Sequence, residues 1–169
     1  MDVQNECISP HFQPKVLSSR IPEFPVIPKM LSTQRHRFLY CVGSHLEFNQ
    51  SPTVKKSGPA GSIMKIDTVD PEKNEVFAFE SFEFPGEVSF VPKVNKDILE
   101  PGHEDHGYLI VLIVNGREKT SELQIFDVEG EGSLEKGPIS KTLLPTFIPH
   151  GLHGSFVEGV TYDFAPFSK

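Results

Sequence analysis

Histidines are the residues of this sequence best suited to metal chemistry. Two pairs share a spacing of three: His150 and His153, among glycines in segment 149–154, and His103 and His106, which flank an acidic pair. A neutral imidazole is a good ligand for iron, zinc or copper. In a strand, residues three apart point to opposite faces, so a pair cannot bind one metal without a bend. The spacing alone favours ordinary loop histidines, and the polar surroundings of the 103–106 pair indicate a solvated turn.

Two glutamates stand in apolar surroundings. Glu23 lies between Pro22 and Phe24, and Glu87 follows Gly86 and precedes a Val-Ser-Phe-Val run. A buried carboxylate is costly unless it accepts hydrogen bonds. Each glutamate therefore caps a turn or faces water, or else it serves a site that requires a buried acid; for either one taken alone, the first interpretation is favoured.

Other catalytic patterns are absent from the sequence. It contains no Gly-x-Ser-x-Gly elbow, no phosphate-binding loop and no dinucleotide-binding fingerprint. Its two cysteines, Cys7 and Cys41, have no neighbours that would activate a thiolate. Two cysteines do not make a disulfide framework, so a reducing compartment is favoured.

Length and charge limit the classes of partner. The 169 residues carry a formal net charge of -7, which argues against binding to nucleic acid or to an anionic membrane surface. The longest apolar run, Tyr108–Val114, falls well short of the roughly 18 residues that span a bilayer. The N-terminus lacks the apolar segment of a signal peptide.

Short strands are the elements that must position these residues. Glycine- and proline-rich breaks such as Asn115-Gly116 separate the candidate strands, and the proline-rich residues 1–34 are predicted to be mostly irregular. The pattern predicts an all-β protein, built as a sandwich, a barrel or the blades of a propeller. The predicted strands are 37–42, 62–67, 75–80, 88–91, 107–114, 122–127 and 139–144.

Four motifs in order resemble the C-terminal region of the carotenoid cleavage dioxygenases, a family that includes retinoid and stilbene relatives. The resemblance runs from about Ile21 to Phe156. It implies an incomplete seven-bladed β-propeller in which residues 21–169 form the C-terminal blades and residues 1–20 an irregular N-terminal segment. The motifs are Pro22–Pro25, Gly86–Pro92, Glu104–Tyr108 and Leu144–Gly154.

The resemblance also implies roles for three side chains. The family holds a non-haem Fe(II) with four histidines, and glutamates behind three of them accept a hydrogen bond from the outer ring nitrogen. His153 matches the fourth iron ligand, and Glu23 and Glu87 match two of these outer glutamates. A carboxylate in that place fixes the tautomer and the orientation of the ring. His150 matches no ligand position, because the family commonly has an aromatic residue there.

The implied activity is cleavage of a carbon–carbon double bond of a carotenoid or apocarotenoid by O2, which gives two carbonyl compounds. The resemblance implies a hydrophobic polyene substrate in an apolar tunnel, peripheral membrane contact of the full-length protein, and a plastid or cytoplasmic location. The other three histidine ligands have no matching motif here, so we expect the isolated chain to be inactive. Two alternatives stay open: a non-catalytic β-module or interaction protein derived from the family, and an unrelated sandwich or lectin-like domain.

Overall fold

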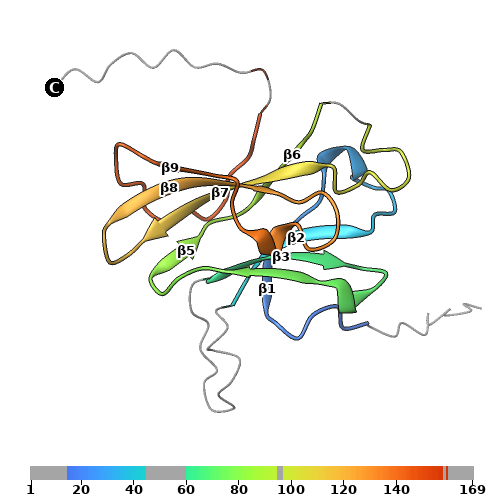
Figure 1. Ribbon diagram of the computed structural model, residues 1–169, viewed down its shortest axis with the longest axis horizontal. Coiled ribbons are helices and arrows are strands. Elements are labelled where there is room, and N and C mark those ends of the chain that lie inside the picture. Colours follow the sequence, from blue (N-terminus) through green and yellow to red (C-terminus); the bar gives the residue numbers. More distant parts are fainter. Residues whose placement is uncertain (1–14, 45–59, 95–96, 158, 160–169) are drawn as a thin grey trace, which may run out of the picture.

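The computed structural model describes residues 15–44, 60–94, 97–157 and 159, and these form two antiparallel sheets (Figure 1). The first sheet has four strands in the order β1-β2-β3-β4, which is also their order along the chain. Each strand therefore pairs with its neighbour in sequence. The strands are β1 (Pro22–Val26), β2 (Phe38–Gly43), β3 (Ser62–Asp67) and β4 (Glu75–Ala78).

The second sheet is organised around its longest strand, β7. Strands β5 and β6 pair with one edge of β7, and β8 and β9 follow on the other side. The β7–β8 hairpin turns on Asn115, whose side-chain Oδ1 accepts hydrogen bonds from the backbone N–H groups of Arg117 and Glu118. The strands are β5 (Glu83–Pro85), β6 (Ser89–Pro92), β7 (Gly107–Asn115), β8 (Thr120–Asp127) and β9 (Ser140–Leu143).

The hydrophobic core lies between the two sheets. Along β7 the residues Leu109, Val111 and Ile113 are buried and alternate with less buried ones, as expected for a strand with one face inward. They pack in one cluster with Tyr40 and Val42 of the first sheet. A smaller cluster covers the other face of the first sheet and contains Cys41, Met64 and Ile66, with Leu17 packed against it.

A buried charged cluster, which we call the Lys65 cluster, connects β3 to the loops of the second sheet. The Lys65 side chain is 2% exposed, and its Nζ lies 2.8 Å from Oδ2 of Asp105 and 3.4 Å from Oε1 of Glu75. Nζ also donates to the backbone carbonyls of Val128 and Gly130, at 2.8 and 2.9 Å. All the N–H groups of the ammonium therefore have oxygen partners.

The predicted all-β fold is confirmed, and the seven predicted segments fall on β2, β3, β4, β6, β7, β8 and β9. In the proline-rich segment 1–34, residues 15–34 are mostly irregular as predicted, and the exceptions are β1 and the short 3-10 helix η1 (Lys29–Leu31). Strand β1 is an edge strand, where prolines are tolerated because one side of the strand needs no ladder hydrogen bonds. Residues 1–14 of that segment lie outside the described residues.

Helical structure in the described part of the chain is limited to turns of three residues. Besides η1 these are η3 (Pro71–Lys73) and η4 (Leu134–Lys136). Among the described residues there is thus no helix with the length and apolar character to cross a membrane.

Candidate metal-ligand site

The first part of the site is an interruption between β5 and β6. Pro85 at the end of β5 is opposite Ile113, and Ser89 at the start of β6 is opposite Ile110, so both strands run along the same edge of β7. Between them, the backbone N–H of Gly86 donates to the carbonyl of Leu112 at 2.8 Å. Glu87 follows in this irregular stretch. Such breaks in a ladder redirect side chains and are common beside functional sites.

The second part is the segment after β9, which is attached to the sheet at two places. The Ser121 Oγ donates to the carbonyl of Ile148 at 2.8 Å and accepts from the N–H of the same residue at 2.9 Å. Further along, Nε2 of His150 lies 3.2 Å from the carbonyl oxygen of Pro85. These contacts lay the chain beside the β5–β6 interruption.

Here His153 meets Glu87, one of the two glutamates that the family resemblance gives as outer carboxylates. Nδ1 of His153 lies 3.4 Å from Oε2 of Glu87, and the backbone N–H of Gly154 donates to the same oxygen at 2.9 Å. The Glu87 side chain is 17% exposed and that of His153 is 67% exposed. With Nδ1 directed at the carboxylate, the other ring nitrogen, Nε2, is the one available to a metal ion.

The third part is the bulged strand β1. Glu23 is exposed, and its side chain forms no hydrogen bond or ion pair with other residues that the structure describes. Its neighbour Phe24 instead contacts the site: the Phe24 and His153 rings are 5.3 Å apart, edge to face at 81°. The structure thus brings together Phe24, Glu87 and His153, while the role of Glu23 stays a prediction.

The expectation of a solvated turn at His103 and His106 is wrong for His106. That side chain is 2% exposed, and its Nδ1 lies 2.8 Å from Oε1 of Glu129. The carbonyl of His106 accepts from the N–H of Lys93 at 3.1 Å, which extends the β6–β7 ladder. Within the described ranges, no three His, Cys, Asp or Glu residues are grouped so that they could hold a metal ion.

Two buried groups of β2 are unsuited to nucleophilic chemistry. Burial raises the pKa of the Cys41 thiol to about 12, so that it stays protonated at neutral pH. Burial, together with the charges of Asp105, Glu75 and Glu104, raises the pKa of Tyr40 well above its usual range. Neither a thiolate nor a phenolate forms here under physiological conditions.

Comparison with known proteins assigns the chain to a family. Residues 2–158 match the family model described as RPE65, retinal pigment epithelial membrane protein. The chain belongs to this carotenoid oxygenase family. The family resemblance seen in the four sequence motifs is thereby confirmed, and with it the all-β architecture of the fold.

Two curated relatives match this chain. Apocarotenoid-15,15'-oxygenase of Synechocystis sp. is 28% identical over 146 residues, which are 85% of this chain and 26% of that protein. Resveratrol cleavage oxygenase 1 of Chaetomium globosum is 33% identical over 88 residues, which are 48% of this chain and 13% of that protein. This carotenoid oxygenase chain therefore spans about a quarter or less of the length of these relatives.

Solved structures agree with the sequence comparison. Cobalt-substituted Synechocystis ACO superimposes with a TM-score of 0.70 at 27% identity, over 85% of this chain and 26% of that one. An ACO/RPE65 chimera superimposes with a TM-score of 0.69 over the same shares. The two sheets thus have the fold of the matching quarter of a carotenoid oxygenase.

Three residues of the site were not predicted from the sequence. Phe24 stands in the same motif as Glu23, but its contact with His153 depends on a bulge that no residue pattern announces. Ser121 and His150 act through long-range hydrogen bonds to backbone groups, 27 and 65 residues away in sequence. Only His150 carried a signal, its place in the histidine pair, and that signal did not indicate the hydrogen bond to Pro85.

Proposed function

We propose that this chain is the C-terminal portion, residues 21–169, of an iron-dependent oxygenase that cleaves a double bond of a carotenoid or apocarotenoid. In this proposal His153 supplies one of the ligands of a non-haem Fe(II), and Glu87 holds its ring. Glu23 serves as an outer carboxylate for a histidine of the remaining part of the protein. The observation that carries the proposal is the contact between Nδ1 of His153 and Glu87, on the fold of this family.

The donor set of the described residues fits one ligand position of such a centre. A histidine ligand presents one nitrogen to the metal and donates the N–H of the other to a carboxylate or carbonyl, which fixes its tautomer. His153 has this arrangement, with an exposed ring whose Nε2 is not held by Glu87. When bound, ferrous iron would activate O2 beside the alkene.

The residues of this chain then have separate tasks. Glu87 fixes the proton of His153 on Nδ1, and the N–H of Gly154 keeps the carboxylate in place and stabilises its negative charge. His150 donates its Nε2–H to Pro85 and so attaches the ligand segment to β5. The polyene substrate is inferred from the family and from the name of the Synechocystis relative.

A chimera tests the proposal. This chain would replace the matching region of the Synechocystis apocarotenoid oxygenase, and the iron content and apocarotenoid cleavage of the purified protein would be measured. We expect His153→Ala to lower bound iron at least tenfold and to abolish cleavage. Glu87→Gln keeps the size of the side chain but weakens acceptance of the Nδ1 proton, and an effect of about 10- to 100-fold on metal affinity or activity is expected.

His36→Ala is the matched control, because His36 is only partly buried and its Nδ1 lies near only the backbone carbonyl of Gln34 among the described residues. It should leave iron content and cleavage unchanged. A chimera that folds, binds iron and cleaves its substrate equally well without the His153 imidazole would contradict the proposal.

The second candidate function, a non-catalytic β-module, is favoured by the exposure of His153 and by the lack of a three-donor cluster in the described ranges. The isolated 169-residue chain tests whether its own residues are enough to hold the metal. It should bind Fe(II) no more tightly than its His153→Ala variant, as measured by calorimetry. Tight binding by the isolated chain that depends on His153 would show that the chain completes a metal centre by itself.

A further inference from the structure

Phe24 has an unusual backbone conformation for a residue with a side chain. Its φ is 52°, in the left-handed region where a bulky residue is uncommon and strained. The residue lies in a bulge: Glu23 is opposite Val42 and Val26 is opposite Tyr40, so two residues of β1 face one residue of β2. Bulges of this kind redirect a side chain. Because strain of this type persists only where the surroundings enforce it, the direction of the Phe24 side chain calls for an explanation.

The redirected ring packs on both the core and the candidate ligand. Phe24 is partly buried and contacts the cluster between the two sheets. On its other side its ring stands against the His153 imidazole, at 5.3 Å and 81°. Such edge-to-face pairs are favourable arrangements of aromatic rings. The ring of an otherwise exposed histidine is thus in contact with a side chain that the core holds in place.

The hydrogen bond to Glu87 is too weak to hold the imidazole by itself. The distance between Nδ1 and Oε2 is 3.4 Å, at the long end for a hydrogen bond. A half-turn of the ring about its Cβ–Cγ bond would exchange Nδ1 for a carbon atom opposite the carboxylate. A second contact is required to disfavour that rotation, and Phe24 is the aromatic neighbour in contact with the ring.

We propose that Phe24 is a positioning residue for His153, whose ring keeps Nδ1 directed at Glu87 and Nε2 directed away from it. This inference rests on the proposed function, since it gives the orientation of the imidazole its purpose as a metal ligand. It differs from that function in one respect: the orientation exists in the chain without metal and can be measured there.

Phe82 provides a matched control within the same chain. It is also a phenylalanine with positive φ, 74°, and is partly exposed. Its ring lies under the guanidinium of Arg117, at 4.1 Å from the ring centroid, rather than against a histidine. A variant at Phe82 therefore reproduces the loss of a strained aromatic residue without loss of a contact to His153.

The test uses the metal-free 169-residue chain labelled with 15N in its histidines. Long-range proton–nitrogen correlation NMR reports which ring nitrogen carries the proton, and His153→Ala assigns the signals. The wild-type ring should populate the tautomer with the proton on Nδ1 several-fold over the other. Phe24→Leu should bring the two tautomers to within about twofold, Phe24→Tyr should keep the wild-type ratio, and Phe82→Leu should leave it unchanged.

A merely structural role for Phe24 predicts a different result. In that case Phe24→Leu would lower stability while the tautomer ratio and the ring-proton shifts of His153 stayed as in the wild type, which overturns the proposal. Phe24→Gly separates the effects further, because it removes the ring and the backbone strain together. We expect a folded chain with a disordered imidazole, and an ordered imidazole in that variant would equally overturn the proposal.

The NMR experiment and the chimera experiment test the two proposals independently, so that either proposal can fail without the other. If Phe24→Leu disorders the ring while iron binding by the chimera proves independent of His153, the positioning role stands and the iron proposal falls. If iron binding requires His153 but Phe24→Leu changes neither the tautomer nor iron occupancy, the iron proposal stands and the positioning role falls.

Discussion

The Lys65 cluster and the His153 site each combine a basic side chain with carboxylate. They differ in how far the basic group is buried and in how many oxygen partners it has. Lys65 is 2% exposed and has four oxygen atoms within 3.4 Å of Nζ. His153 is 67% exposed and has one carboxylate oxygen at that distance. The first group is fully satisfied by this chain and contributes to its fold. The second has its ring oriented while most of its surface stays open, as suits a ligand whose other partners come from elsewhere.

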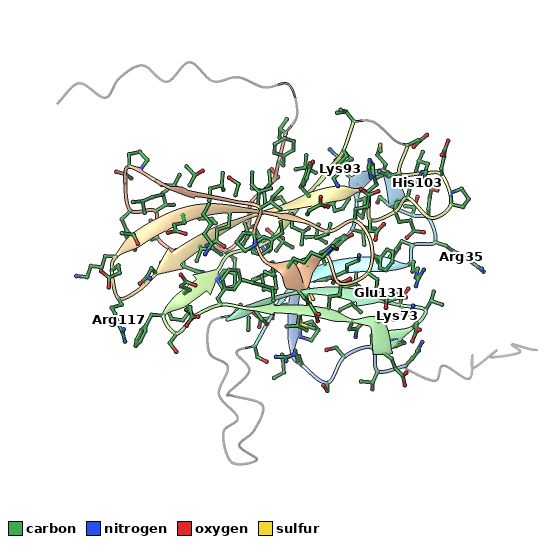
Figure 2. All side chains as sticks on the ribbon, viewed as in Figure 1. Arg35, Lys73, Lys93, His103, Arg117 and Glu131 are labelled. Atoms are coloured by element: carbon green, nitrogen blue, oxygen red, sulfur yellow. The ribbon has the colours of Figure 1, made fainter. Side chains whose placement is uncertain are left out.

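Lys65→Met should have the largest effect on stability. It leaves the buried carboxylates of Asp105 and Glu75 without their cation, and removal of one member of a buried ion pair costs about 3–5 kcal/mol. The free energy of unfolding from urea titration measures this loss. Lys73→Met is the control, because the side chains of the Lys73–Glu131 pair, 2.9 Å apart, are 44% and 72% exposed; both are labelled in Figure 2. The variant at Lys73 should show no measurable change; equal losses at both positions would contradict the comparison.

Glu75→Gln should lower the free energy of unfolding more than Glu87→Gln does. This difference should be smaller than the one between the two lysine variants. Glu75 accepts from the N–H of Leu134 at 2.8 Å and faces Lys65, so loss of its charge should cost about 1–3 kcal/mol. Glu87 is more exposed and serves the open site, and its change should cost about 0.5 kcal/mol or less. Urea titrations of the metal-free variants measure both values. A larger loss at Glu87 would mean that the site residue is in fact a structural one.

Acid should lower the stability of the protein through protonation of Asp67. Burial raises the pKa of this carboxyl, but hydrogen bonds from Arg37 and from the backbone N–H groups of Asp70 and Val69 outweigh that effect, and the pKa lies below its usual range. An acid with a depressed folded-state pKa stabilises the protein above its unfolded pKa, about 4, and that contribution is lost as the pH falls further. The urea concentration at the midpoint of unfolding should therefore fall as the pH is lowered below about 4, and it should fall less steeply in Asp67→Asn. Parallel curves would exclude this residue as a cause.

His153→Ala should have the smallest effect on the metal-free fold. An exposed side chain with one long polar contact contributes within about 0.5 kcal/mol to stability. The same substitution is expected to remove the metal site in the chimera, so function and stability separate at this position. Thermal or urea unfolding of the isolated variant measures the effect, and a loss comparable with that of Glu75→Gln would show that the imidazole holds the fold.

The regular strands could be predicted from the sequence because apolar residues alternate with others along a strand that has one buried face. Along β7, Leu109, Val111 and Ile113 point inward and the residues between them do not. Strand β1 could not be predicted from the same signal, since its prolines argue against a strand unless its position at the sheet edge is known. Edge position is a property of the assembled sheet and is not written in the local pattern.

The family motifs pointed to His153, Glu23 and Glu87 but did not say which glutamate faces the imidazole. The irregular backbone that brings Glu87 to the ring was not predicted. Both outer glutamates of the sequence prediction occur at breaks in strand pairing, Glu23 in the β1 bulge and Glu87 between β5 and β6. Residue type reveals that an acid stands in an apolar run. It does not reveal that the backbone bends there, and the bend decides whether Glu23 or Phe24 meets the imidazole.

The Ser121 hydroxyl gives the ligand segment a fixed point on β8. Because one oxygen both donates to and accepts from Ile148, the chain cannot slide past that point without losing two hydrogen bonds at once. The four residues between Ile148 and His153 are then a short tether of constant length. A change of sequence at residues 145–147 would therefore leave the imidazole in the same place.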